Sequence, residues 1–131
     1  MPSATGTFDV VSMNEDVYQV ADGEPKLTHA SGDQKFTGDI IGEGSVHWLM
    51  CFVPAGGARF VGLQRVAGSL GGRTGSFVME SVGNHDGKSS KGSWTVIEGS
   101  GTGALTEIRG RGSFDAPGGR TVSYRLDYEL G

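Results

Sequence analysis

The sequence predicts an all-β fold: a single eight-stranded antiparallel up-and-down barrel that spans residues 1–131. Short runs of strand-forming residues alternate with turn residues along the chain, and no run of about ten residues or more has helical periodicity. Glycine supplies 24 of the 131 residues, well over twice the roughly 7% of average proteins. Glycine-rich chains with many short strands favour sandwiches or barrels, and closing a meander into a barrel removes its exposed edges.

A glycine followed by Ser or Thr and then by a large apolar residue recurs along the chain. The five copies are Gly6-Thr7-Phe8, Gly44-Ser45-Val46, Gly75-Ser76-Phe77, Gly92-Ser93-Trp94 and Gly112-Ser113-Phe114. The third residue of each copy is bulky, so we expect it to point into the barrel. Because side chains alternate between the faces of a strand, the same parity places Trp48, Met50, Phe60 and Met79 inside.

Eight strands follow from alternating residues bounded by turn residues. The last strand alternates most clearly, with Val122, Tyr124 and Leu126 on one face and polar residues on the other. The predicted strands are Thr5–Ser12, Leu27–Ile41, Gly44–Val53, Arg59–Leu70, Arg73–Val82, Lys91–Glu98, Gly112–Asp115 and Arg120–Leu130.

The connections between these strands are predicted to be turns and two longer loops. The pairs Gly56-Gly57 and Gly71-Gly72 tolerate the positive φ of two-residue hairpins, and Gly42 is expected to turn the second strand into the third. Residues 13–26 are predicted to form a polar, acidic loop. Residues 99–111 are predicted to form a loop with one helical turn that caps the barrel. The sequence leaves open which end of the barrel is the mouth.

Composition argues against several classes of function. The net charge of −4 comes without any basic run, which argues against a nucleic-acid partner. No apolar stretch approaches about 18 residues, so no membrane span is expected. The start of the chain lacks a secretion signal, and Cys51 is the single cysteine, so we expect a cytoplasmic protein.

Neither a cofactor nor a metal is expected. The run Gly99-Ser-Gly-Thr-Gly103 lacks the lysine of a phosphate-binding loop and no strong helix follows it. His29, His47 and His85 have no metal-ligand spacing.

Strands three to five depart from the simple alternation. From Val46 to Val53 both faces are largely apolar, and Val61 and Leu63 oppose Phe60. A sheet that is apolar on both faces is covered on both. In a small barrel without helices we expect the outer cover to be another subunit, so the sequence predicts a homo-oligomer through strands three to five.

The predicted interior is aromatic, contains methionine and carries few polar groups. Converging polar groups in an apolar cavity are the usual form of a small-molecule site, although a filled core explains the same residues. The candidate ligand-binding residues are Trp48, Met50, Phe60, Gln64, Met79, Tyr124 and Tyr128, and the catalytic candidates are Gln64, Tyr124 and Glu98.

Several stretches, in this order, resemble a bacterial domain-of-unknown-function family that adopts the allene oxide cyclase-like β-barrel. They include Ala4-Thr-Gly-Thr-Phe8, Asp22-Gly-Glu-Pro-Lys-Leu-Thr28, Phe60-Val-Gly-Leu-Gln-Arg-Val66, Gly71-Gly-Arg-Thr-Gly-Ser-Phe77 and Leu126-Asp-Tyr128. The resemblance covers nearly the whole chain and implies the barrel fold and oligomerisation, but no general activity. Related barrels bind apolar substrates and steer cyclisation or coupling.

These observations predict a barrel that binds a small apolar or amphipathic molecule. If the chain is an enzyme, we expect a cofactor-independent isomerase or cyclase that uses shape and a few hydrogen bonds. Gln64 would serve there as a hydrogen-bond donor, because an amide does not transfer protons at pH 7. The alternatives are a non-catalytic binding or carrier protein and a structural oligomer with a filled barrel.

Overall fold

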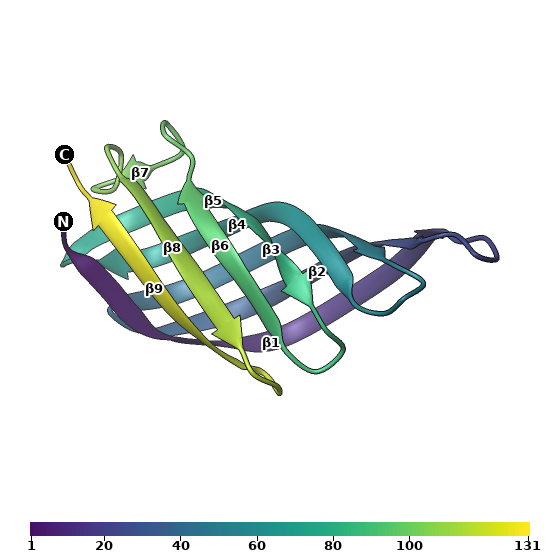
Figure 1. The fold of residues 1–131 in the computed structure, drawn as a ribbon. Helices are drawn as coiled ribbons and strands as arrows, with labels where there is room; N and C mark the ends of the chain where they lie inside the picture. The colour runs from purple at the N-terminus through teal and green to yellow at the C-terminus, as the bar shows by residue number, and fades with distance from the viewer.

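One antiparallel sheet closes on itself, because β4 pairs with β5 as well as with β3. The computed structural model describes all 131 residues, and none of them is helical (Figure 1). The strands are β1 Ser3–Gln19, β2 Lys26–Gly38, β3 Ile40–Phe52, β4 Ala58–Leu70, β5 Arg73–His85, β6 Ser90–Val96, β7 Thr102–Gly103, β8 Arg109–Ala116 and β9 Thr121–Glu129.

The ring of strands confirms the predicted eight-stranded barrel. It runs β1-β2-β3-β4-β5-β6-β8-β9 and returns to β1, while β7 adds only two residues beside β5. Each predicted strand corresponds to one member of the ring, so the chain is an up-and-down meander apart from β7. The structure contains no helix long and apolar enough to cross a membrane.

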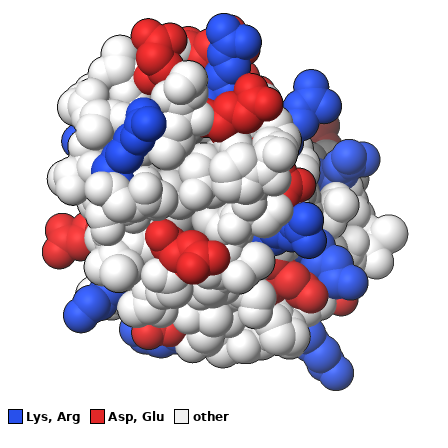
Figure 2. Space-filling model, turned by 90° about the vertical axis from the view of Figure 1, so that its left-hand side faces the viewer, with Lys and Arg blue, Asp and Glu red and all other residues white.

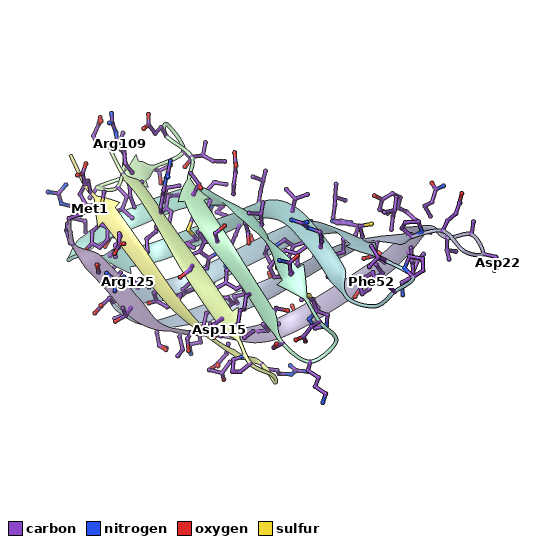
Figure 3. All side chains as sticks on the ribbon, viewed as in Figure 1. Met1, Asp22, Phe52, Arg109, Asp115 and Arg125 are labelled. Carbon is purple, nitrogen blue, oxygen red and sulfur yellow. The ribbon has the colours of Figure 1, made fainter.

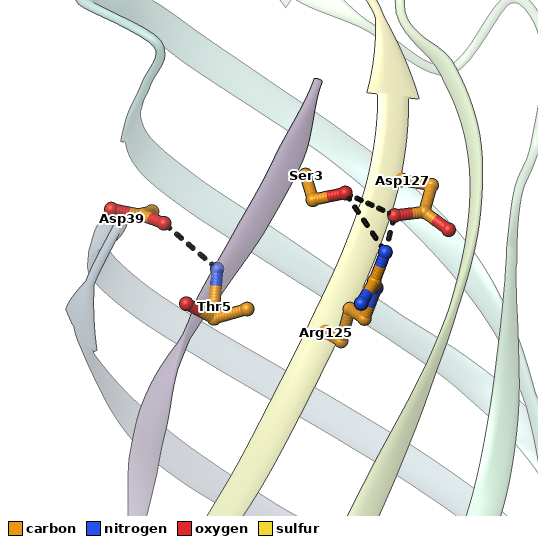
Figure 4. Close-up of polar contacts among 5 residues, drawn as sticks. All are labelled: Ser3, Thr5, Asp39, Arg125 and Asp127. Carbon is orange, nitrogen blue, oxygen red and sulfur yellow. Dashed lines mark hydrogen bonds and ion pairs between the residues drawn. The ribbon is translucent and has the colours of Figure 1, made fainter. Parts of the chain in front are cut away.

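Polar side chains reinforce the seam between the first and last strands (Figure 4). The Ser3 hydroxyl on β1 donates to Asp127 on β9, and Arg125 forms an ion pair with the same carboxylate at 3.2 Å. The hydrogen bond from Ser3, followed by that from Arg125, lowers the pKa of the Asp127 carboxyl. Nearby, the backbone N–H of Thr5 donates to the Asp39 carboxylate at 2.9 Å, which ties the β2–β3 turn to β1.

The prediction that residues 13–26 form a loop is wrong for most of that segment, because only residues 20–25 connect β1 to β2. Residues 13–19 continue β1 and pair with the first part of β2, so the two strands project as a long arm beyond the barrel (Figure 1). A register shift between Val10 and Ser12 leaves Val11 as the extra residue of a bulge. The pairing supplies the backbone hydrogen bonds that a polar loop would have left to water.

Other strand boundaries also differ from the prediction, and two of them change which residues can reach the interior. The β2–β3 turn lies at Gly38 and Asp39, where Gly38 has a φ of 97°, and Gly42 is paired with Gly68 inside β3. Strand β6 ends at Val96, so Glu98 lies in a turn outside the barrel wall.

The core contains the third residue of every glycine unit. Phe8, Val46, Phe77, Trp94 and Phe114 are all 6% exposed or less, as their parity predicts. Aromatic rings stack through the centre, with the Phe8 and Phe36 centroids 4.9 Å apart. The small cross-section of an eight-stranded barrel is just wide enough for side chains to fill it or for one small ligand.

The glycine of the repeated unit makes room for these bulky neighbours. A Cβ on Gly92 would lie 2.4 Å from Cζ of Phe114 and 2.7 Å from the carbonyl oxygen of Val82. A Cβ on Gly44 would lie 2.7 Å from Cε1 of Phe36 and 2.9 Å from Oε1 of Gln34. At Gly44 and Gly92, the glycine is therefore an inward position left empty so that an aromatic ring on a neighbouring strand can fill it.

The loop between β6 and β8 closes one end of the barrel. Leu105 and Ile108 are each 1% exposed and belong to the core cluster. The N–H of Ile108 donates to the carbonyl of Leu105 at 3.1 Å, the three-residue separation expected for one helical turn. The predicted capping role of this loop is confirmed. Seen from this closed end, charged side chains of both signs are interspersed over the surface (Figure 2).

Candidate functional site

The candidate site is a cavity of about 350 Å³ at the end opposite the capping loop. Its wall is mostly hydrophobic, with 11 apolar residues among the 15 that line it. Figure 3 shows Phe52 and Asp115 towards this end of the barrel and Met1 and Arg109 at the other. The turn after β3, the β5–β6 turn and the β8–β9 turn all lie at the open end.

Aromatic side chains form the base of this cavity. The Trp48 and Phe60 ring centroids are 5.2 Å apart, and those of Phe60 and Phe114 are 6.1 Å apart. The Trp48 indole N–H donates to the Ser81 hydroxyl at 3.3 Å, so its polar edge is satisfied and its ring remains available for apolar contact.

Three polar side chains interrupt the apolar wall: His85, Ser90 and Glu15. Nδ1 of His85 lies 2.7 Å from the Ser90 hydroxyl across the β5–β6 pair. Glu15 comes from the projecting arm, opposite Ala30. These groups give the cavity a hydrogen-bonding edge above an aromatic base.

The Lys26 ammonium lies close to this edge. It sits 4.6 Å from the centroid of the Phe52 ring, which itself lines the cavity. Lys26 on β2 pairs with Phe52 on β3. Phe52 in turn pairs with Ala58 at the start of β4, and Ala58 pairs with His85 at the end of β5. A cation and an imidazole therefore belong to one ring of residues around the mouth.

The predicted ligand-binding residues divide between the cavity and the packed core. Trp48, Met50 and Phe60 line the cavity. The remaining four do not line it and are at most 7% exposed: Gln64, Met79, Tyr124 and Tyr128.

Gln64 belongs to a buried polar network inside the core. Its amide nitrogen donates to Oε1 of Gln34 at 2.7 Å, and its oxygen accepts from the indole N–H of Trp94 at 3.1 Å. The amide nitrogen of Gln34 is buried without a partner. Because the donor and the acceptor of Gln64 are both used internally, its geometry corresponds to a structural role.

The Tyr124 hydroxyl also holds the barrel together. It donates to the carbonyl of Thr37 at 2.9 Å and accepts from the backbone N–H of Ile40 at 2.9 Å. Burial raises the pKa of the Tyr124 phenol, against the opposing effect of the hydrogen bond from Ile40. The phenol thus stays protonated and bridges β9 to the β2–β3 turn.

The expectation that Glu98 points into the barrel is wrong. The carboxylate is 69% exposed and pairs with Arg109 at 3.7 Å on the surface of the closed end. The reason is the end of β6 at Val96, after which the strand parity no longer applies.

Sequence reasoning missed the polar residues of the cavity. His85 has the same parity as Phe77 and Met79 and would have been found if strand five had been extended through Gly83. Glu15 had no such signal, because the bulge at Val11 moves Met13 and Glu15 to the inner face. No group of three or more His, Cys, Asp or Glu side chains is placed to hold a metal ion.

Comparison of the fold with solved structures and comparison of the sequence with protein families give the same result. A solved structure from Shewanella oneidensis MR-1, described as a protein of unknown function from the DUF3224 family, is 26% identical. It superposes with a TM-score of 0.84, and the match covers 100% of this chain and 98% of that one. No curated protein sequence matches. Residues 4–128 match the family described as "Protein of unknown function (DUF3224)", and the chain therefore belongs to the DUF3224 family.

Proposed function

We propose that the barrel binds one small apolar or amphipathic molecule in its open mouth. The observation that carries the proposal is the cavity of about 350 Å³ with an aromatic base and a polar edge. Its volume is near the lower end of the range of about 300–1,000 Å³ for ligand pockets, which favours a small ligand. An apolar part would contact Trp48, Phe60 and Phe114, and a polar group would reach His85, Ser90 or Lys26.

The packed state of the remaining core supports this location. Below the cavity, Trp94, Gln64, Met79 and Leu126 are at most 1% exposed, which leaves no second space for a ligand around them. The capping loop closes the far end with Leu105 and Ile108. Entry is therefore expected only from the end that bears the projecting arm.

Binding without catalysis is the form that the side chains support best. The hydrogen-bonding groups of Gln64 and Tyr124 are committed to the core, and Glu98 lies on the surface. An isomerase or cyclase acting in the same cavity would instead depend on His85, whose Nδ1 is held by Ser90 while Nε2 has no partner within the chain. Such an enzyme would lose turnover of epoxide or polyene substrates on His85→Ala, whereas a carrier has no turnover to lose.

The binding proposal is tested by filling the cavity. Ala116 on β8 lines the cavity, whereas Ser113 on the same strand faces outward and is exposed. In a titration with the fluorescent probe 1-anilinonaphthalene-8-sulfonate, Ala116→Trp is expected to weaken binding at least tenfold. Ser113→Trp is the matched control and should bind as the native protein does.

Native mass spectrometry of protein purified from its host complements the titration, because a retained ligand would appear as a discrete added mass. A probe that binds the native protein and Ala116→Trp equally would refute the location. A native protein that neither binds the probe nor retains a ligand would refute the proposed function.

A further inference from the structure

A row of apolar side chains lies exposed on the outside of the barrel. Leu49, Val61 and Val82 are paired directly across β3, β4 and β5, and they are 52%, 54% and 43% exposed. Leu63, the next outward residue of β4, is 53% exposed. Cross-strand partners lie about 5 Å apart, so these side chains form one continuous apolar surface, here called the β3–β5 face.

The same row becomes polar on the rest of the barrel. Val82 pairs with Ser93 on β6, which pairs with Ser113 on β8, which pairs with Arg125 on β9. Within this row, the outward apolar residues are therefore confined to β3, β4 and β5. Contiguous exposed apolar surface of this kind marks an interaction site in soluble proteins.

The β3–β5 face is also hollowed. A groove of about 700 Å³ crosses it and is lined by 14 residues, 8 of them hydrophobic. Tyr18 and Leu27 of the projecting arm form one side, and Lys91 and Ser93 of β6 form the other. The outward residues Leu49, Val61 and Val82 line this groove and do not line the ligand cavity, although Met50 and Phe60 belong to both linings.

We infer that the β3–β5 face is covered by a second copy of this chain. Its charges favour self-association, because Arg59 and Arg65 on β4 accompany Glu43 on β3 and Glu80 on β5. All four residues are exposed, and none forms an ion pair within the chain. A second copy presents the same two cations and two anions, so each charge can find an opposite partner across the interface.

The surface area agrees with such an interface. The single chain exposes 7255 Å², whereas a monomeric protein of 13.6 kDa exposes roughly 6,600 Å². The excess of roughly 650 Å² is about four-fifths of the ~800 Å² that each partner loses in an interface of standard size. The projecting arm, whose Tyr18 lines the groove, contributes to this excess.

The test is the mass of the native protein in solution, measured by sedimentation equilibrium at 2–50 µM. The native chain is expected to associate within this range. Val61→Asp places a charge at the centre of the face and should shift the protein to monomer, with at least a tenfold weaker association. Ser113→Asp, on the polar sector of the barrel, is the matched control and should associate normally. Because Val61 is exposed, Val61→Asp should keep the native far-UV circular dichroism, and Leu49→Lys repeats the test on β3 if it does not.

Alkylation of Cys51 by iodoacetamide locates the contact. Cys51 is the single cysteine of the chain and lines the groove. Its reaction rate should fall several-fold between 2 and 50 µM native protein and remain constant in Val61→Asp. A native protein that is monomeric at 50 µM overturns the inference, and so does a Val61→Asp variant that associates like the native chain. Because this face and the ligand cavity lie on opposite sides of the sheet, either proposal can fail without the other.

Discussion

The amide nitrogen of Gln64 on β4 donates a hydrogen bond of 2.7 Å to Oε1 of Gln34 on β2, across the strand that separates them. The contact is made over Gly44 of β3, where a Cβ would lie 2.9 Å from that same oxygen. Gly44 lies inside β3, where the glycine of the repeated unit allows two buried amides to meet inside the barrel.

The energetic coupling of Gln34 and Gln64 is the first prediction. Leu at either position removes the hydrogen bond and leaves buried polar atoms unsatisfied, which costs about 1–3 kcal/mol. In urea denaturation, the double variant is expected to be more stable than the sum of the two single losses implies, with a coupling energy of about 1 kcal/mol. Additive losses would mean that the two amides do not interact.

Overpacking at Gly92 is the second prediction. Gly92→Ala places a methyl group against the Phe114 ring and the carbonyl oxygen of Val82, and neither can move without disturbing the sheet. The free energy of unfolding should fall by about 1–3 kcal/mol. Ser93→Ala, at the adjacent outward position, serves as the control and should change stability by less than about 0.5 kcal/mol. Equal stability of the two variants would contradict the close approach.

The third prediction concerns how the stability of the fold changes at acidic pH through the Asp86 carboxyl. The backbone N–H groups of Ser89 and Lys88 donate to its carboxylate and hold its pKa below the ordinary value of 3.8. A pKa that is lower in the folded state stabilises the protein at pH values above the pKa of the unfolded state. This stabilisation is lost as the pH falls through the pKa of the folded state.

Asp86→Asn should therefore lower the midpoint of thermal unfolding at pH 7, and the difference from the native protein should shrink below about pH 4. Carbon-13 NMR titration of the Asp86 carboxyl measures the shift directly. Ser89→Ala, which removes the hydroxyl that also donates to Asp86, should move that pKa part of the way back. A difference in melting temperature that stays constant down to pH 2 would contradict this assignment.

The capping loop provides the fourth prediction. Leu105 is 1% exposed, so Leu105→Ala should reduce the free energy of unfolding by about 2–5 kcal/mol. The exposed Glu107, two residues along the same loop, provides the control as Glu107→Ala. Hydrogen exchange at the Ile108 amide, which donates to Leu105, should accelerate only in the first variant. Unchanged stability would mean that the loop does not plug the barrel.

Much of the wall could be predicted because it depends on local alternation. The parity of Phe8, Trp94 and Phe114 identified the inward face, and Gly56-Gly57 and Gly71-Gly72 marked two hairpins. Errors arose where a longer-range pairing overrode local composition. The acidic residues after Ser12 indicated a loop, but pairing with β2 makes them a strand.

The candidate site was predictable only in part for the same reason. Trp48, Met50 and Phe60 followed from parity, and they line the cavity. Parity also selected Gln64 and Tyr124, which point inward but lie in packed core, because it reports the face of a strand and not the depth along the barrel. Depth depends on how the strands are staggered around the ring, which no single strand encodes.

The sequence by itself determined that this chain is a glycine-punctuated, closed β-barrel with an aromatic interior and a two-sided apolar sector. Those features follow from the alternation of inward and outward side chains along each strand and from glycines at turns and crowded positions. Only the tertiary structure decided which end is open, since the burial of Leu105 and Ile108 closes the other. It also decided which polar groups meet: the bulge at Val11 brings Glu15 to the cavity wall, and pairing of β5 with β6 brings His85 to Ser90. These are contacts between distant segments, and their geometry exists only once the register of the whole ring has been set.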